Sequence, residues 1–182
     1  MGQTLKIGVV LDAYARLPLA ASVFTREPTA RQMAGLVSRA VTRVGPPRYL
    51  VSDRGAQFTA RLFAQTLSRL GIRHRFGAIG SPGATARIER FWRTVKMLMT
   101  IKRCPPLSRA DLATRLETAL AYYAAYKPHT GLSGATPLEI YLGLTPAHTR
   151  ARAPTSSATI PRLEIGSLDP DRRFPIVVAR AA

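Results

Sequence analysis

The chain has 182 residues, of which 46% are hydrophobic, so it can form one folded domain with a small appendage, and a disordered chain is excluded. Lysine and arginine number 27 against 10 acidic residues, and the net charge of +17 indicates a polyanionic partner such as nucleic acid. One cysteine excludes an internal disulfide, and no run approaches the roughly 18 apolar residues of a membrane span.

Two apolar runs near the start predict an antiparallel hairpin. Residues 6–11 and 18–24 are rich in strand formers and are separated by a short segment. Asp12 ends the first run, where capping of the turn is the expected role and metal ligation is the alternative. A helix is expected from Thr29 to Gly45.

Asp53 directly follows a short apolar strand, residues 48–52. This strand is expected to lie parallel to the strand before the helix, because a strand-helix-strand crossover joins parallel strands. Asp53 then sits at a carboxyl strand end, where open α/β sheets form ligand sites. Residues 54–59 are expected to form a loop, residues 60–70 a helix and residues 72–76 an edge strand.

Glu89 lies in a segment with helical periodicity, residues 84–101, which follows a Gly-rich loop at residues 77–83 that we expect to be mobile. One face of this helix is apolar, and its members are Ile88, Phe91, Trp92, Val95 and Met99. At about 100° per residue, Glu89 falls at the border of that face. The helix therefore predicts a second carboxylate that is neither fully buried nor fully turned outward.

Asp53 and Glu89 are the candidate catalytic and metal-binding pair. Two converging carboxylates repel each other unless a cation lies between them, and such hard oxygen ligands suit Mg²⁺ or Mn²⁺. A pair of these ions supports in-line displacement at phosphorus. The alternative interpretation is structural, with Asp53 capping the following loop and Glu89 pairing with Arg93 on the helix surface.

Three motifs together resemble the core of the DDE recombinases, the family of retroviral-type integrases and insertion-sequence transposases. They are Ser52-Asp-Arg-Gly-Ala-Gln-Phe58, the helix containing Arg87-Ile-Glu-Arg-Phe-Trp-Arg-Thr-Val-Lys96, and residues 127–141. The resemblance covers roughly residues 5–143. It implies an α/β, RNase H-like mixed sheet flanked by helices, and metal-dependent DNA strand cleavage and strand transfer during integration or transposition. It also implies a homo-oligomer, because two element ends must be joined.

The chain departs from the family pattern in two places. The family's first catalytic aspartate lies on a strand that has no counterpart here, so we expect a core that lacks its first strand, from a truncated or degenerate reading frame. Thr85 and Ala86 replace the Asn-Gly that many members carry just before the glutamate. Two alternatives stay open: an inactive, basic DNA-binding or dimerising protein, and an RNase H-type nuclease.

Basic residues around the two acids are the candidate DNA contacts. They are Arg54, Arg87, Arg90, Arg93 and Lys96. Side chains of this kind hold phosphates and position a strand without reading its sequence. The alternative interpretation for the four helical members is a solvated helix face.

The rest of the chain predicts two more helices and a separate tail. Ser108 is expected to cap a helix that runs through Ala125, His129 to finish a turn with a phosphate contact as the alternative, and residues 137–142 to form a last short helix. We therefore divide the chain into a catalytic core at 1–143, a linker at 144–158 and a small β segment at 159–182. We expect a cytoplasmic, nucleoid-associated bacterial protein with no membrane partner.

Overall fold

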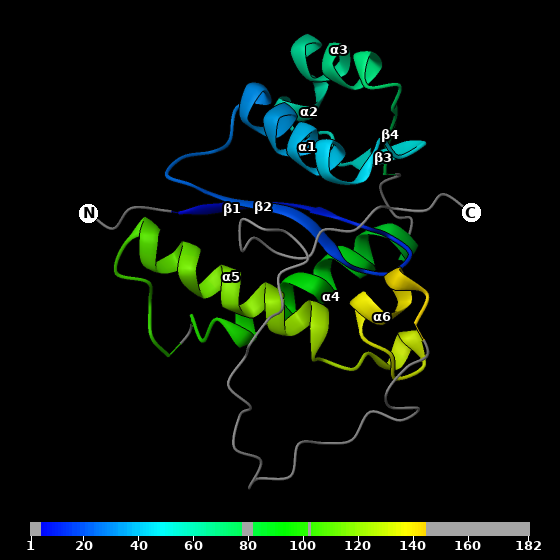
Figure 1. The fold of residues 1–182 in the computed structure, drawn as a ribbon. Helices are drawn as coiled ribbons and strands as arrows, with labels where there is room; N and C mark the ends of the chain where they lie inside the picture. The colour runs from blue at the N-terminus through cyan, green and yellow to red at the C-terminus, as the bar shows by residue number, and fades with distance from the viewer. Residues whose placement is uncertain (1–4, 78–81, 102, 145–182) are drawn as a thin grey trace, which may run out of the picture.

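The computed structural model describes residues 5–77, 82–101 and 103–144, and the predicted linker and C-terminal β segment lie outside this part. A two-stranded hairpin forms the middle layer, with α1 to α3 on one side and α4 to α6 on the other (Figure 1). None of the described helices is long and apolar enough to cross a membrane. The observed architecture is the expected mixture of strands and flanking helices.

The hairpin consists of β1 (Lys6–Leu11) and β2 (Pro18–Phe24), which pair antiparallel as predicted. Its turn is held by Asp12, which is 5% exposed. The backbone N–H of Asp12 donates to the carbonyl of Leu17 at 2.8 Å. The Asp12 carboxylate accepts from the backbone N–H groups of Tyr14 at 3.3 Å and Ala15 at 2.8 Å. The predicted capping role is therefore confirmed.

Replacement of Asp12 by alanine is expected to destabilise the fold. The change leaves two backbone N–H groups of a buried turn without their acceptor, which costs about 1–3 kcal/mol in the free energy of unfolding. Urea unfolding followed by circular dichroism measures this loss. Asp12→Asn is the matched control, because its amide oxygen retains one acceptor and should recover part of the stability. An unchanged unfolding midpoint in both variants would contradict the capping role.

Helix α1 (Ala30–Val44) packs against both strands of the hairpin. Thr29 caps it as predicted: its side chain accepts from the N–H of Gln32, and the Gln32 side chain accepts from the N–H of Thr29. Gly45 ends the helix with φ of 79°, a backbone conformation that suits glycine. The buried face of α1 consists of Met33, Ala34, Leu36, Val37, Ala40 and Val44.

The second strand pair differs from the expectation. β3 (Tyr49–Ser52) pairs in parallel with β4 (Arg73–Phe76), and in the described part of the chain this pair is separate from the hairpin. The predicted parallel neighbour of β3 was β2. Periodicity identifies strands by their buried side chains but carries no information on which strand edges become neighbours, so the pairing could not be deduced.

Two helices connect β3 to β4. The short α2 (Ala56–Thr59) occupies part of the expected loop, because Gly55 provides the first carbonyl acceptor for the N–H groups of Phe58 and Thr59. It is followed by α3 (Arg61–Arg69), which buries Phe63 and Leu67 against α1.

The lower layer is built from α4 (Pro82–Leu98) and α5 (Arg109–Ala125). Phe91, Val95 and Met99 of the predicted apolar face are buried, while Ile88 and Trp92 are partly buried against the same cluster. Ser108 caps α5 as predicted, since its side chain accepts from the N–H of Asp111 at 3.0 Å. The 3₁₀ helix η1 (Thr130–Leu132) and α6 (Pro137–Leu142) complete the described fold.

Candidate functional site

Asp53 is exposed at the carboxyl end of β3, where the sequence predicts it. Its Oδ1 accepts a hydrogen bond from the N–H of Gly55 at 2.9 Å, so the loop-capping contact of the alternative interpretation is formed, and metal binding by Asp53 stays a prediction. The N–H of Gly77 donates to the carbonyl of Ser52 at 2.8 Å, which extends the β3–β4 pairing to the residue beside Asp53. One carboxylate oxygen is thus oriented by the backbone while the side chain stays accessible to a ligand.

Glu89 is exposed on α4. In the described part of the chain the ion pairs are Lys6 with Glu27 and Arg115 with Asp111, so the alternative pairing of Glu89 with Arg93 is not formed. The Glu89 carboxylate is not neutralised by a hydrogen-bonded partner among these residues. It is therefore available to a cation from solution.

The order of β3, β4 and α4 along the chain connects Asp53 with Glu89. The carboxyl ends of β3 and β4 lie together, and the five residues 77–81 lead from β4 to the start of the helix that carries Glu89. That the two carboxylates share one ion stays a prediction. Among the described residues, no group of three or more acidic, histidine or cysteine side chains could hold a metal ion.

Asp12 does not support the alternative of a substitute metal ligand. Both of its oxygens accept hydrogen bonds from backbone N–H groups of its own turn, and the side chain is buried. A carboxylate used in this way stabilises a turn and has little capacity left for a cation.

The candidate DNA contacts divide into two groups. Arg93 and Lys96 are exposed along α4, and the guanidinium of Arg54 lies over the Phe76 ring, 5.3 Å from its centroid. Arg87 and Arg90 lie on the side of α4 that faces the hairpin turn and the end of α5. Arg87 Nη1 donates to the carbonyl of Ala13, in the hairpin turn, at 3.4 Å. All five side chains are exposed, but Arg93 and Lys96 lie on an open face of α4, whereas Arg87 and Arg90 border a cavity.

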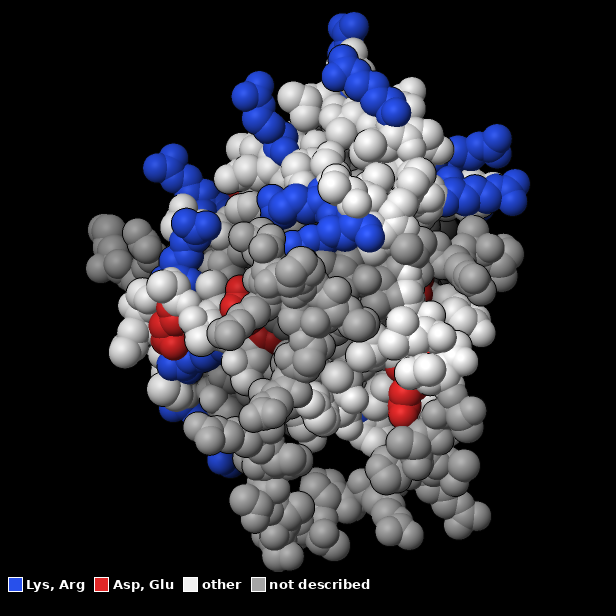
Figure 2. Space-filling model, viewed as in Figure 1, with Lys and Arg blue, Asp and Glu red and all other residues white. Residues whose placement is uncertain are grey.

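Positive charge dominates the surface around these elements. Figure 2 shows Lys and Arg side chains standing out over the half of the molecule that contains α1 to α3 and β3 to β4, with few acidic side chains on this face. The ion pairs among the described residues are Lys6 with Glu27 and Arg115 with Asp111, so most of the described cations are not compensated locally. Such a surface attracts a polyanion.

His74 is a packed side chain on β4. Its Nε2 lies 2.9 Å from Ser52 Oγ, and its ring contacts those of Phe63 and Phe76 at centroid distances of 5.4 and 4.4 Å. Burial lowers the pKa of His74 below its usual value. The residue supports the β3–β4 pair beneath Asp53.

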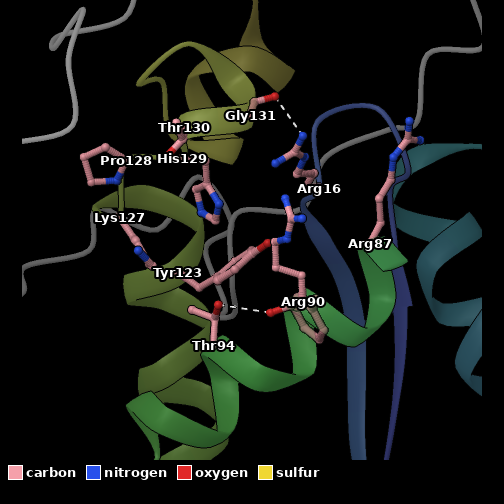
Figure 3. Close-up of a pocket in the computed structure, with 11 residues that line it drawn as sticks. Arg16, Arg87, Arg90, Thr94, Tyr123, Lys127, Pro128, His129, Thr130 and Gly131 are labelled. Carbon is pink, nitrogen blue, oxygen red and sulfur yellow. Dashed lines mark hydrogen bonds between the residues drawn. The ribbon is translucent and has the colours of Figure 1, made fainter. Parts of the chain in front are cut away.

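A cavity of about 280 Å³ beside α4 was not foreseen from the sequence. It lies between α4, the C-terminal end of α5 and the loop before η1 (Figure 3). Its polar lining includes Arg16, Arg90, Lys127 and His129, which come from three distant parts of the chain. Arg87, Arg90 and His129 are each candidate phosphate contacts by sequence, but no local pattern in the sequence indicates that they share one cavity.

His129 was predicted to finish a turn, but it begins one: its carbonyl accepts from the N–H groups of Leu132 and Gly134, and it directly precedes η1. Its ring packs edge-on against Tyr123 with centroids 4.6 Å apart. Burial lowers the pKa of His129 to about 4; a hydrogen bond with the Tyr123 backbone opposes this, and the charges of Lys127 and Arg16 add to the lowering. The imidazole is therefore neutral at physiological pH.

The low pKa of His129 predicts that the fold loses stability in mild acid. In the unfolded chain the ring takes up a proton near pH 6.5, whereas the folded chain resists protonation until about pH 4. Stability is therefore fully present above pH 6.5 and falls as the pH drops toward 4. Urea midpoints measured at pH 7.5, 6 and 5 should fall more for the native chain than for His129→Gln. If the urea midpoints of the native chain and of His129→Gln fall equally with pH, His129 does not cause the loss of stability in acid.

Two sequence relatives show the family context. The chain is 30% identical over 140 residues to the uncharacterized protein K02A2.6 of Caenorhabditis elegans, covering 74% of this chain and 10% of that protein. It is 31% identical over 153 residues to the Gag-Pol polyprotein of Gibbon ape leukemia virus, covering 81% of this chain and 8% of the polyprotein. The chain thus spans about a tenth of the length of these relatives.

Solved structures share the fold. The catalytic core domain of BIV integrase is 28% identical with a TM-score of 0.62, covering 75% of this chain and 85% of that one. The simian T-cell lymphotropic virus intasome, solved with the PP2A regulatory subunit B56 gamma, matches at 19% identity and a TM-score of 0.64. The match covers 84% of this chain and 52% of that chain. The HTLV-2 integrase catalytic core in complex with magnesium is 20% identical with a TM-score of 0.56, and the match covers 71% of this chain and 80% of that chain.

These likenesses define the class of the fold: an RNase H-like α/β core similar to retroviral integrase catalytic cores. Two family models, both described as integrase core domain, match residues 1–82 and 70–137. The chain belongs to this integrase core family, the retroviral type of DDE recombinase. The resemblance drawn from its motifs is confirmed.

Proposed function

We propose that this chain is the catalytic core of an enzyme that cleaves DNA strands and transfers their ends in a divalent-metal-dependent reaction, with Asp53 and Glu89 as the metal ligands. The observation that carries the proposal is the placement of two exposed acids in an integrase core. One follows β3, and the other lies on the helix reached from the adjacent strand β4. DNA integration or transposition is the corresponding biological process.

The two acids fit a hard divalent cation. Both offer exposed carboxylate oxygens, and neither is engaged in an ion pair within the described residues. Oxygen donors of this type suit Mg²⁺ or Mn²⁺, and the HTLV-2 integrase core was solved in complex with magnesium. When bound, such ions stabilise the attacking and leaving oxygens of a displacement at phosphorus.

The chain's own residues orient the ligands and the DNA. The N–H of Gly55 fixes one oxygen of Asp53, which leaves the other free to face a cation. Arg93 and Lys96 lie exposed on the helix that carries Glu89, where they are suited to hold backbone phosphates. We infer that the reacting strand runs along this face of α4.

A third carboxylate would come from outside the described residues, since these contain no group of three metal-ligating side chains. This observation also favours a second candidate function, a DNA-binding protein that keeps the fold without activity. Reading the DNA upstream of the Met1 codon separates the two. An in-frame apolar strand that ends in aspartate would support the enzyme, and a stop codon would support the inactive binder.

DNA and a further copy of the chain are the proposed partners. The basic surface favours DNA, and the neighbouring HTLV-2 cores were solved in dimeric and trimeric forms. Association of two copies would allow two DNA ends to be processed together. We also propose, as expected from the sequence, a nucleoid-associated bacterial protein; the high net positive charge supports association with DNA.

DNA binding is expected to weaken steeply with salt. Each neutralised phosphate contributes about −0.9 to the slope of log Kobs against log[salt]. Removing Arg93 and Lys96 together, as Arg93→Gln with Lys96→Gln, should therefore make the slope less steep by about 2 and weaken binding equally for unrelated DNA sequences. Fluorescence anisotropy with two unrelated duplexes at several salt concentrations measures this. An unchanged slope would exclude these two side chains from the DNA interface.

A further inference from the structure

The cavity beside α4 collects positive charge without an acidic partner. Arg16, Arg87, Arg90 and Lys127 line it, and no Asp or Glu is among its described lining residues. Like charges that share one small cavity repel each other, so a bound anion would stabilise the arrangement. A volume of about 280 Å³ lies at the low end of ligand pockets and suits one small anionic group.

Arg16 is held in place for such a contact. Its Nη2 donates to the carbonyl of Gly131 at 2.7 Å, which ties the hairpin turn to the loop before α6. A guanidinium carries five N–H donors, so this single hydrogen bond fixes its position and leaves further donors for a ligand. In Figure 3, the side chains of Arg16 and Arg90 approach each other near the Tyr123 ring.

His129 adds a buried polar atom that lacks a partner. Its Nε2 is shielded from solvent and makes no hydrogen bond within the described residues. The charged groups that face the ring are Arg16 and Lys127, with Tyr123 packed against it. An anion in the cavity would offset the two cations and so favour a proton on the ring, which would then donate to the anion.

We propose that this cavity is a phosphate-binding site that holds one backbone phosphate of the DNA engaged by α4. The assignment to DNA rests on the proposed function. It is favoured by the position of two lining residues next to Glu89 on α4: Arg90 directly follows Glu89, and Arg87 lies two residues before Glu89. A phosphate anchored here fixes where the strand crosses α4 relative to the reacting position.

The first test uses inorganic phosphate alone. At constant ionic strength, replacing chloride by 10–50 mM phosphate, roughly the range for a weak single-anion site, should raise the melting temperature of the native chain. The double variant Arg90→Gln with Lys127→Gln should melt at least as high in chloride, because it loses repulsion, but should not respond to phosphate. Arg103→Gln, an exposed cation beyond the end of α4 and outside the cavity, is the matched control and should respond like the native chain. Absence of the response in the native chain overturns the site.

The second test locates the phosphate in DNA. A series of duplexes, each with one backbone phosphate replaced by an uncharged methylphosphonate, is measured by anisotropy. At one position the replacement should weaken binding to the native chain and to Arg103→Gln by roughly tenfold, the scale of a hydrogen bond to a charged group. The same replacement should have no effect on the double variant, since the two changes remove one contact.

The outcomes separate this inference from the proposed function. If every position affects the native chain and the double variant equally, while inorganic phosphate still stabilises the native chain, the cavity takes a free anion and the DNA assignment is overturned. If the native chain binds no DNA, the proposed function fails together with the DNA assignment. In that case the melting response to phosphate still decides whether the cavity is an anion site.

Discussion

Replacing either candidate metal ligand is expected to abolish strand cleavage while DNA binding persists. Asp53→Asn or Glu89→Gln keeps the size of the side chain but removes the charge that holds the cation, so nicking of supercoiled plasmid should fall by about 100-fold or more. The assay uses the protein encoded by the longest open reading frame that contains this chain, and it is run with Mn²⁺ or Mg²⁺. Anisotropy should show an unchanged or slightly tighter affinity for DNA, because a negative charge is lost from a basic surface.

Glu117→Gln is the matched control for this experiment. Glu117 is an exposed acid on α5 and changes the net charge by the same amount. Its nicking activity should equal that of the native chain. Equal activity of all three variants would remove Asp53 and Glu89 from the metal site, whereas inactivity of the native chain with every divalent metal would favour the inactive DNA-binding protein.

Truncation of Phe63 is expected to cause the largest loss of stability. Phe63 is fully buried on α3, with its ring edge-on to Phe58 at 5.3 Å and to His74 at 5.4 Å. Phe63→Ala removes these contacts and leaves a cavity between α1 and α3, which costs about 3–5 kcal/mol in the free energy of unfolding. Chemical denaturation measures the change.

The adjacent residue provides the control for Phe63. Leu62 is 38% exposed on the same helix, so Leu62→Ala should cost well under half as much. Because Phe63 also supports His74 beneath Asp53, partial loss of nicking activity is expected at temperatures where the variant begins to unfold. Equal destabilisation by both substitutions would contradict the described packing of α3.

Elements with local signals were predicted almost to the residue. Thr29 and Thr136 each begin a helix through hydrogen bonds with a glutamine or glutamate three residues later, and such signals can be read directly from the sequence. The hairpin strands were equally well defined. Leu62, in contrast, is 38% exposed beside the buried Phe63, because a nine-residue helix buries only a narrow face.

Features that depend on distant contacts could not be predicted in this way. The pairing of β3 with β4 depends on which strand edges meet, and the cationic cavity joins Arg16 to Gly131 across 115 positions of the chain. The position of Asp53 at a carboxyl strand end was foreseen, because strand and acid are sequence neighbours. The anion site was not, because its cations approach each other only after the hairpin, α4 and α5 are assembled.

The packing of the β1–β2 hairpin on α5 affects synthesis on the ribosome. The hairpin is made early, but the helix that covers its lower face follows much later, and Arg109 reaches the carbonyl of Val23 across 86 positions. At about 5–20 residues per second, the apolar underside of the nascent hairpin stays uncovered for on the order of ten seconds. We therefore expect chaperones to bind the emerging chain during this interval, and lower growth temperatures or chaperone co-expression should raise the soluble yield.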